Sequence, residues 1–143
     1  MKTNILYILS ILILSISFTA CSKDDDDSKG GSDIEKKLVG KWQMTQVIVD
    51  GVKENPSDRS SVYQTCDYKG WQIYNADGTA EGYDYCDKTT DRGTWKIKDG
   101  KLVVTGSAFP IEFGVQIKEL TDTKLVVYFE FVQKQELTYK RLE

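Results

Sequence analysis

Apolar and polar residues alternate with a period of two along much of the chain. The clearest example lies between Ile111 and Lys118, where every second residue is apolar. This pattern predicts a β-strand with one face in a core and the other in water. By the same pattern, further strands are expected at 41–49, 68–74, 79–85, 93–98, 101–105, 125–131 and 135–142.

Short polar segments join these runs. Asp50-Gly51, Asp77-Gly78 and Asp99-Gly100 are typical of tight turns between antiparallel strands. No helical segment between strands is long enough for a parallel crossover. The pattern therefore predicts an all-β fold in which eight sequential antiparallel strands close into an up-and-down barrel, with a two-sheet sandwich as the alternative.

The first strand is expected to follow a short helical turn over 33–39, with Asp33 as its N-cap. In that strand Trp42, Met44 and Ile48 should share the inward face, with Gln46 as a polar interruption. The long polar stretch 52–63 is expected to be a surface loop. The apolar positions expected inside the barrel are Trp42, Met44, Ile73, Trp95, Ile97, Leu102, Val104, Ile111, Phe113, Val115, Leu125, Val127, Phe129 and Phe131.

The N-terminus has a different pattern. An apolar run from Ile5 to Phe18, about 14 residues long, is shorter than the roughly 20 needed to span a bilayer as a helix. Together with Lys2 it predicts a secretory signal peptide over 1–20. The segment Phe18-Thr19-Ala20-Cys21 resembles a bacterial lipobox, which implies lipid attachment at Cys21. Ordinary cleavage near Ala20, leaving a free thiol, is the alternative.

Residues 21–33 are expected to form a flexible, lipidated acidic tether ahead of a domain at 34–143. Four consecutive aspartates, 24–27, resemble the acidic tag of surface-exported lipoproteins in Bacteroidota, and a plain acidic spacer is the alternative. The resemblance implies an outer-membrane, lipid-anchored protein that is exposed on the cell surface. The membrane, through its anchor, is then the expected partner.

Composition narrows the choice of partners and chemistry. The chain has 19 basic and 22 acidic residues and no basic cluster, so nucleic acid is not an expected partner. With Cys21 assigned to lipid, Cys66 and Cys86 remain as a pair. In an exported protein such a pair is expected to form a disulfide, with two buried free thiols as the alternative.

The sequence contains no histidine. This excludes histidine-based triads and general bases and removes the usual ligand of most transition-metal sites. We therefore expect no enzyme, no metal and no cofactor. An alternative is carboxylate chemistry, or a hard cation, at Asp84, Asp87 and Asp91, although their spacing matches no calcium loop.

Gly40-Lys41-Trp42 at the start of the first strand matches the Gly-x-Trp signature of lipocalins. With Asp77-Gly78-Thr79, Gly93-Thr94-Trp95 and Tyr139-Lys140-Arg141, the chain from Leu38 onward resembles bacterial lipocalin-like lipoprotein domains. The resemblance implies that Arg141 covers Trp42 at the closed end of the barrel. The long C-terminal helix of animal lipocalins is missing.

A lipocalin-like barrel implies a small apolar or amphipathic ligand held at the open end. A structural or protein-interaction module with a filled barrel is the alternative, with Tyr63, Tyr68, Tyr74 and Tyr128 exposed to a partner. The candidate ligand-binding residues are Gln46, Trp71, Tyr83, Tyr85, Phe113 and Phe129.

Overall fold

The structure is a computed structural model that describes residues 32–107 and 111–143. The signal peptide, Cys21 and most of the predicted tether lie outside the described residues. Within the described part, no helix has the length and apolar character needed to cross a membrane.

A short helix precedes the barrel. Helix α1 (Asp33–Leu38) begins with a capping box, in which Ser32 accepts from the Glu35 amide and Glu35 accepts from the Ser32 amide. The N-cap is therefore Ser32, and the expectation of Asp33 was wrong by one residue. Asp33 instead lies in the first turn, where its charge complements the helix dipole.

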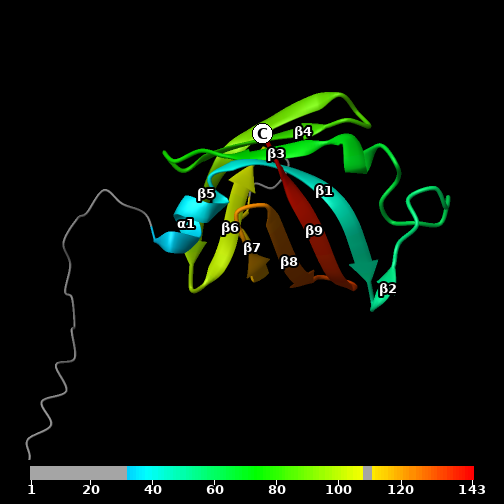
Figure 1. Cartoon of the computed structure of the whole chain (residues 1–143). Coiled ribbons are helices and arrows are strands. Elements are labelled where there is room, and N and C mark those ends of the chain that lie inside the picture. The colour runs from blue at the N-terminus through cyan, green and yellow to red at the C-terminus, as the bar shows by residue number, and fades with distance from the viewer. Residues whose placement is uncertain (1–31, 108–110) are drawn as a thin grey trace, which may run out of the picture.

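Eight strands form a closed antiparallel barrel, as the alternation predicted. Each strand pairs with the next along the barrel, and pairing of the first strand with the last closes it (Figure 1). A ninth, two-residue strand, β2 (Val52–Lys53), only extends the first hairpin. The barrel strands are β1 (Gly40–Val49), β3 (Trp71–Tyr74), β4 (Thr79–Asp84), β5 (Thr89–Lys98), β6 (Lys101–Gly106), β7 (Phe113–Leu120), β8 (Lys124–Glu130) and β9 (Lys134–Leu142).

The barrel has two different ends. Helix α1 lies at one end, together with the β3–β4, β5–β6 and β7–β8 turns, and we call this end the closed pole (Figure 1). The 54–70 segment lies at the opposite end with the β4–β5 and β8–β9 turns, and we call this end the mouth. The mouth segment includes a short 3-10 helix, η1 (Asp67–Lys69), so the strand expected from residue 68 begins only at Trp71.

A β-bulge changes which residues of β1 face inward. The pairing of β1 with β9 shifts between Met44 and Gln46, so Thr45 is an extra residue on the β1 side. Trp42 and Met44 are buried as expected, but beyond the bulge Val47 and Val49 are buried in place of Ile48. Gln46 pairs with Thr138 on the outer face, so its assignment to the inward face was wrong.

Most of the other expected core positions are buried or packed against the core, including Trp95, Leu102, Leu125 and Val127. Two are not. Ile111 precedes β7 and is 72% exposed, and Phe131 lies in the β8–β9 turn and is 81% exposed. In both cases the predicted strand was longer than the observed one, because β7 begins at Phe113 and β8 ends at Glu130. Ile73 was also misassigned, because its neighbour Tyr74 faces the core.

Candidate functional site

The closed pole is sealed by Trp42 and Arg141. The Trp42 ring is fully buried and its Nε1 donates to the Leu38 carbonyl at 2.8 Å. The Arg141 guanidinium lies over this ring, with Cζ 4.3 Å from the centroid. Arg141 also donates to the carbonyls of Lys37, Val39 and Asp122. One side chain therefore joins α1, the last strand and the β7–β8 turn.

Gly40 explains the first position of the Gly-x-Trp signature. Its φ is +142°, and a Cβ there would overlap Nη1 of Arg141. Only glycine leaves room for the guanidinium at this point of the chain and also adopts this backbone conformation. The short motif is therefore a packing requirement of the closed pole.

A cavity of about 480 Å³ lies inside the barrel and opens at the mouth. This volume is within the range typical of small-molecule sites. Phe113 and Phe129 face each other edge to face within it, with ring centroids 5.4 Å apart. The other apolar side chains that line it include Met44, Leu102, Val104, Val115, Leu125, Val127 and Leu137.

Uncharged polar groups lie among these apolar walls. The Tyr74 hydroxyl donates to Gln72 Oε1 at 2.7 Å, and the Tyr63 hydroxyl donates to Gln135 Oε1 at 2.8 Å. Burial raises the pKa of the Tyr74 and Tyr139 phenols, and for Tyr139 the neighbouring Tyr74 adds to the effect. Burial and the nearby Asp67 carboxylate also raise the Tyr63 pKa. At neutral pH the lumen therefore offers phenols and an amide, which bind by hydrogen bonds and carry no charge.

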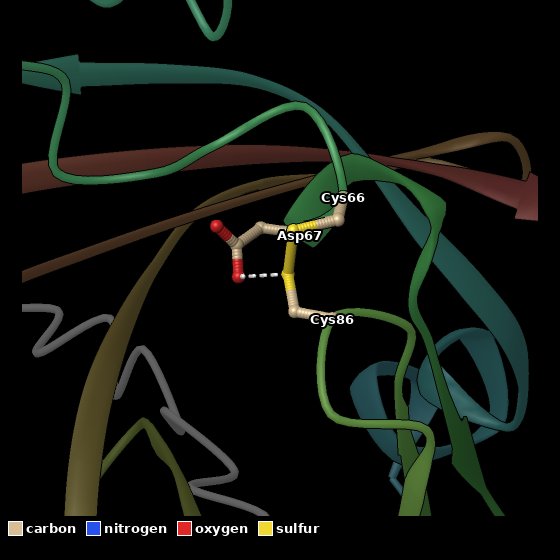
Figure 2. Close-up of side chains that lie close together, drawn as sticks. All are labelled: Cys66, Asp67 and Cys86. Carbon is tan, nitrogen blue, oxygen red and sulfur yellow. Dashed lines mark hydrogen bonds between the residues drawn. A yellow bond between two sulfur atoms is a disulfide. The ribbon is translucent and has the colours of Figure 1, made fainter. Parts of the chain in front are cut away.

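A disulfide between Cys66 and Cys86 fixes the long segment at the mouth, as expected for the cysteine pair (Figure 2). It joins the residue before η1 to the β4–β5 turn, with the Cα atoms 5.1 Å apart. Asp67 Oδ1 lies 3.5 Å from Cys86 Sγ. Because a disulfide sulfur has no hydrogen, this is a contact and not a hydrogen bond. Cys66, Asp67 and Cys86 also form a compact donor group, but with both sulfurs oxidised it does not supply thiolate ligands.

The predicted ligand-binding residues separate into three groups. Phe113 and Phe129 face the lumen, and Gln46 does not border the cavity. Trp71, Tyr83 and Tyr85 border its edge. Trp71 and Tyr83 pair across β3 and β4, on the face opposite Gln72 and Tyr74, so their rings point outward. All three were expected at the open end of the barrel, and all three border the cavity, so their contact with a ligand stays a prediction.

The outward rings of β3 and β4, together with the residue after β4, form an aromatic row that consists of Trp71, Tyr83 and Tyr85. Trp71 and Tyr83 stack with centroids 5.7 Å apart, and Tyr85 meets Tyr83 edge to face. Lys41 Nζ lies 4.2 Å from the Trp71 centroid and Lys69 Nζ lies 5.2 Å from the Tyr85 centroid. Both ammonium groups therefore interact with the outer row.

Two alternatives from the sequence concern other residues, namely a group of aspartates and a set of exposed tyrosines. Asp84 and Asp91 line the cavity, whereas Asp87 lies in the β4–β5 turn and does not. Of the tyrosines expected to be exposed to a partner, Tyr74 is buried, and Tyr63 and Tyr68 pack against the core. That expectation was wrong for these three residues.

The sequence analysis missed Gln72, Tyr74, Leu137 and Tyr139 as lumen residues. In β9 a signal was present, because Leu137, Tyr139 and Arg141 alternate on one face. In β3 the signal was misleading. Trp71 and Ile73 are the more hydrophobic pair, yet Gln72 and Tyr74 face inward.

A closed eight-stranded antiparallel barrel with one sealed pole and a lumen open at the other defines the lipocalin-like class of protein. A family model described as the lipocalin-like domain matches residues 38–127. The chain belongs to this family.

Two solved structures have a similar fold. One is a lipocalin-like protein from Bacteroides uniformis, with a TM-score of 0.55 and 16% identity, covering 74% of this chain and 99% of the other. The second is an uncharacterized protein from Bacteroides eggerthii, with a TM-score of 0.50 and 16% identity, covering 73% and 99%. At this identity the likeness concerns the fold alone. No curated protein matches the chain.

Proposed function

We propose that the protein is an envelope lipoprotein whose barrel binds a small apolar or amphipathic molecule. The observation that supports this proposal best is the cavity of about 480 Å³ with mainly apolar walls. An eight-stranded barrel can either be filled by its own side chains or hold one small ligand. A space of this size favours the second case over a filled barrel. The proposal assigns binding rather than catalysis, in keeping with a chain that contains no histidine.

Binding is tested with N-phenyl-1-naphthylamine, an uncharged probe whose fluorescence increases in apolar surroundings. The purified domain is expected to bind it with one site per chain. Val104→Phe and Val115→Phe add bulk inside the lumen and should weaken binding. Val52→Phe is the matched control, because Val52 is 67% exposed outside the barrel. Equal binding by the control and by both lumen variants, all folded by circular dichroism, would refute a lumen site.

The cellular part of the proposal is lipid attachment at Cys21 and residence at the outer membrane, on the cell surface. It is supported by the lipobox-like segment and the acidic run that follows it. Cys21→Ser should move the protein from the membrane fraction to the soluble fraction. Intact mass of the membrane-extracted protein should correspond to a chain that begins at Cys21 and bears acyl groups, and protease added to whole cells should digest it. An unmodified mass would contradict the proposed anchor.

A second candidate function is protein interaction through the outer aromatic row of Trp71, Tyr83 and Tyr85. The stacked Trp71–Tyr83 pair on the outer face favours it, because aromatic residues are enriched at binding hot spots. Crosslinking on whole cells should then give one dominant neighbour that Trp71→Ala removes and Tyr128→Ala retains.

A further inference from the structure

The charged groups that line the cavity are mostly acidic. They are the carboxylates of Asp67, Glu81, Asp84 and Asp91 and the guanidinium of Arg92. Glu81 and Arg92 pair with each other across β4 and β5, with Oε2 and Nε 3.1 Å apart. This pair neutralises itself and lies on the outward face of the sheet. The remaining charge of the cavity lining is therefore negative and comes from the three aspartates.

Strand register directs two of these aspartates inward. Asp84 follows Ala80 and Gly82 on the lumen face of β4, and Asp91 precedes Gly93 and Trp95 on the lumen face of β5. Both are at the mouth end of their strands. They therefore lie above the apolar walls and not among them.

Neutral donors orient these carboxylates. Asp84 Oδ1 accepts from the amides of Cys86 and Asp87 at 2.7 and 3.1 Å. Asp91 Oδ1 accepts from the Ser107 amide at 3.2 Å and from the Ser107 hydroxyl. These hydrogen bonds fix where the two carboxylates lie.

Asp67 lies in η1, on the 54–70 segment. Its Oδ2 accepts from the Gln64 amide at 2.6 Å. The Cys66–Cys86 disulfide holds η1 beside the β4–β5 turn, and Figure 2 shows the Asp67 carboxylate against this bridge. The disulfide therefore fixes Asp67 beside the turn that follows Asp84, and all three aspartates border the same cavity.

The three aspartates border the cavity at the mouth. Deeper in the lumen the groups are apolar or neutral, and the described residues include no buried charged side chain. A ligand that matches this arrangement has a positive head at the mouth and an apolar tail below it.

We propose that the lumen selects cationic amphiphiles, meaning molecules with an ammonium head and an aliphatic or aromatic tail, over fatty acids. This inference rests on the proposed binding function and adds the ligand class. A carboxylate head would meet Asp67, Asp84 and Asp91, and Arg92, the one cation among the described lining residues, pairs with Glu81 on the outward face. An ammonium head would be attracted by the same groups, and this attraction weakens as salt screens it.

The test compares three ligands with the same ten-carbon tail: decyltrimethylammonium, 1-decanol and decanoate. Each is used below its micellar concentration to displace N-phenyl-1-naphthylamine from the full barrel. We expect the cation to bind at least about tenfold more tightly than decanoate at low salt. Added sodium chloride should reduce this ratio and leave decanol binding unchanged.

Two variants locate the selectivity. Asp84→Asn and Asp67→Asn should each weaken the cation several-fold and leave decanol unchanged, and two positions are tested because either aspartate also orders its turn. Glu119→Gln is the charge-matched control, because Glu119 lies at the closed pole and pairs with Lys124. A variant that also loses decanol binding has lost the cavity, and the other variant then decides.

The outcomes separate the two proposals. If none of the three ligands displaces the probe, the proposed binding function fails and this inference fails with it. If decanol and decanoate bind as tightly as the cation, the binding function stands and the charge selectivity is overturned. The same holds if Glu119→Gln weakens the cation as much as the mouth variants do.

Discussion

The Arg141 guanidinium covers the Trp42 indole at 4.3 Å, and these two residues pair directly across β1 and β9. This contact lies at the seam where the barrel closes. Because Arg141 also binds the carbonyls of Lys37 and Val39, the same side chain attaches α1 to the seam. Several consequences of this arrangement and of the mouth can be measured.

Arg141→Lys should lower the free energy of unfolding by about 2–4 kcal/mol, because an ammonium cannot reach three carbonyls and cover an indole at once. Urea denaturation followed by tryptophan fluorescence measures this loss. Arg92→Lys is the control, since the Arg92 side chain is 81% exposed and its single ion pair contributes about 1 kcal/mol or less. Equal losses in the two variants would contradict the role of Arg141.

Gly40→Ala should be more destabilising than Gly51→Ala. Both glycines have positive φ, but a Cβ at residue 51 meets nothing within 4 Å, whereas at residue 40 it overlaps the guanidinium. The difference contains crowding by Arg141 and also backbone strain, because φ is +142° at residue 40 and +83° at residue 51. In an Arg141→Ala background the crowding is removed and the difference should shrink. An undiminished difference there would show that Arg141 does not contribute to it.

Replacing Cys66 and Cys86 together by serine should cost about 3 kcal/mol, the value the chain-entropy model gives for a loop of about 20 residues. Chemical denaturation of the variant and of the oxidised wild type provides the comparison. Ligand affinity should fall as well, because the bridge holds Asp67 at the mouth. Unchanged unfolding midpoints would argue that the two cysteines are not joined in the native protein.

Stability should decrease as pH rises above about 10. Burial raises the pKa of Tyr74 and Tyr139 in the folded protein, whereas in the unfolded chain a phenol titrates near 10. Above that pH the folded state binds more protons than the unfolded state, so rising pH favours unfolding. Below pH 10 this contribution is fully present.

Urea denaturation at pH 8 and pH 11 measures this decrease. Tyr74→Phe and Tyr139→Phe should each make it smaller, and Tyr128→Phe, on the outer face, is the control. If the decrease is the same in all three variants, the buried phenols are not responsible.

Deleting Thr45 should leave the barrel folded. Thr45 is the extra residue of the bulge, so its removal joins Met44 to Gln46 in an unbroken register with β9, in which Val47 and Val49 stay inward and Gln46 stays outward. Circular dichroism and a thermal melt measure this, with Thr45→Ala, expected to cost less than about 1 kcal/mol, as the control. Loss of the cooperative melt in the deletion variant alone would mean that the bulge itself is needed for closure.

Alternation and turn residues were sufficient to predict eight antiparallel strands and their closure, because side-chain period and tight turns are local properties. The Trp42–Arg141 contact was expected from the resemblance and not from the pattern. The bulge at Thr45 could not be predicted, since it depends on which β9 residues lie opposite. In β3, hydrophobicity favoured Trp71 and Ile73, whereas pairing with β1 and β4 turns Gln72 and Tyr74 inward.

Whether the lumen residues could be predicted depended on the same features, namely strand pairing and register. Its aromatic pair, Phe113 and Phe129, could be found from alternation, because each lies in a regular part of its strand. Its polar groups could not, because Gln72 and Tyr139 become lumen residues only through the pairing of strands distant in sequence. The acidic mouth likewise requires the disulfide to bring Asp67 to the strand aspartates.

Because β1 pairs with β9, the contacts that seal the barrel join residues more than 90 positions apart, such as Arg141 with Val39. They cannot form until nearly the whole chain is available, and their high sequence separation predicts slow, late folding. Until β9 docks, β1 and β8 both expose unpaired edges that other chains could join. Docking of β9 covers both edges, and it therefore ends the stage of folding at which the protein is most prone to aggregate.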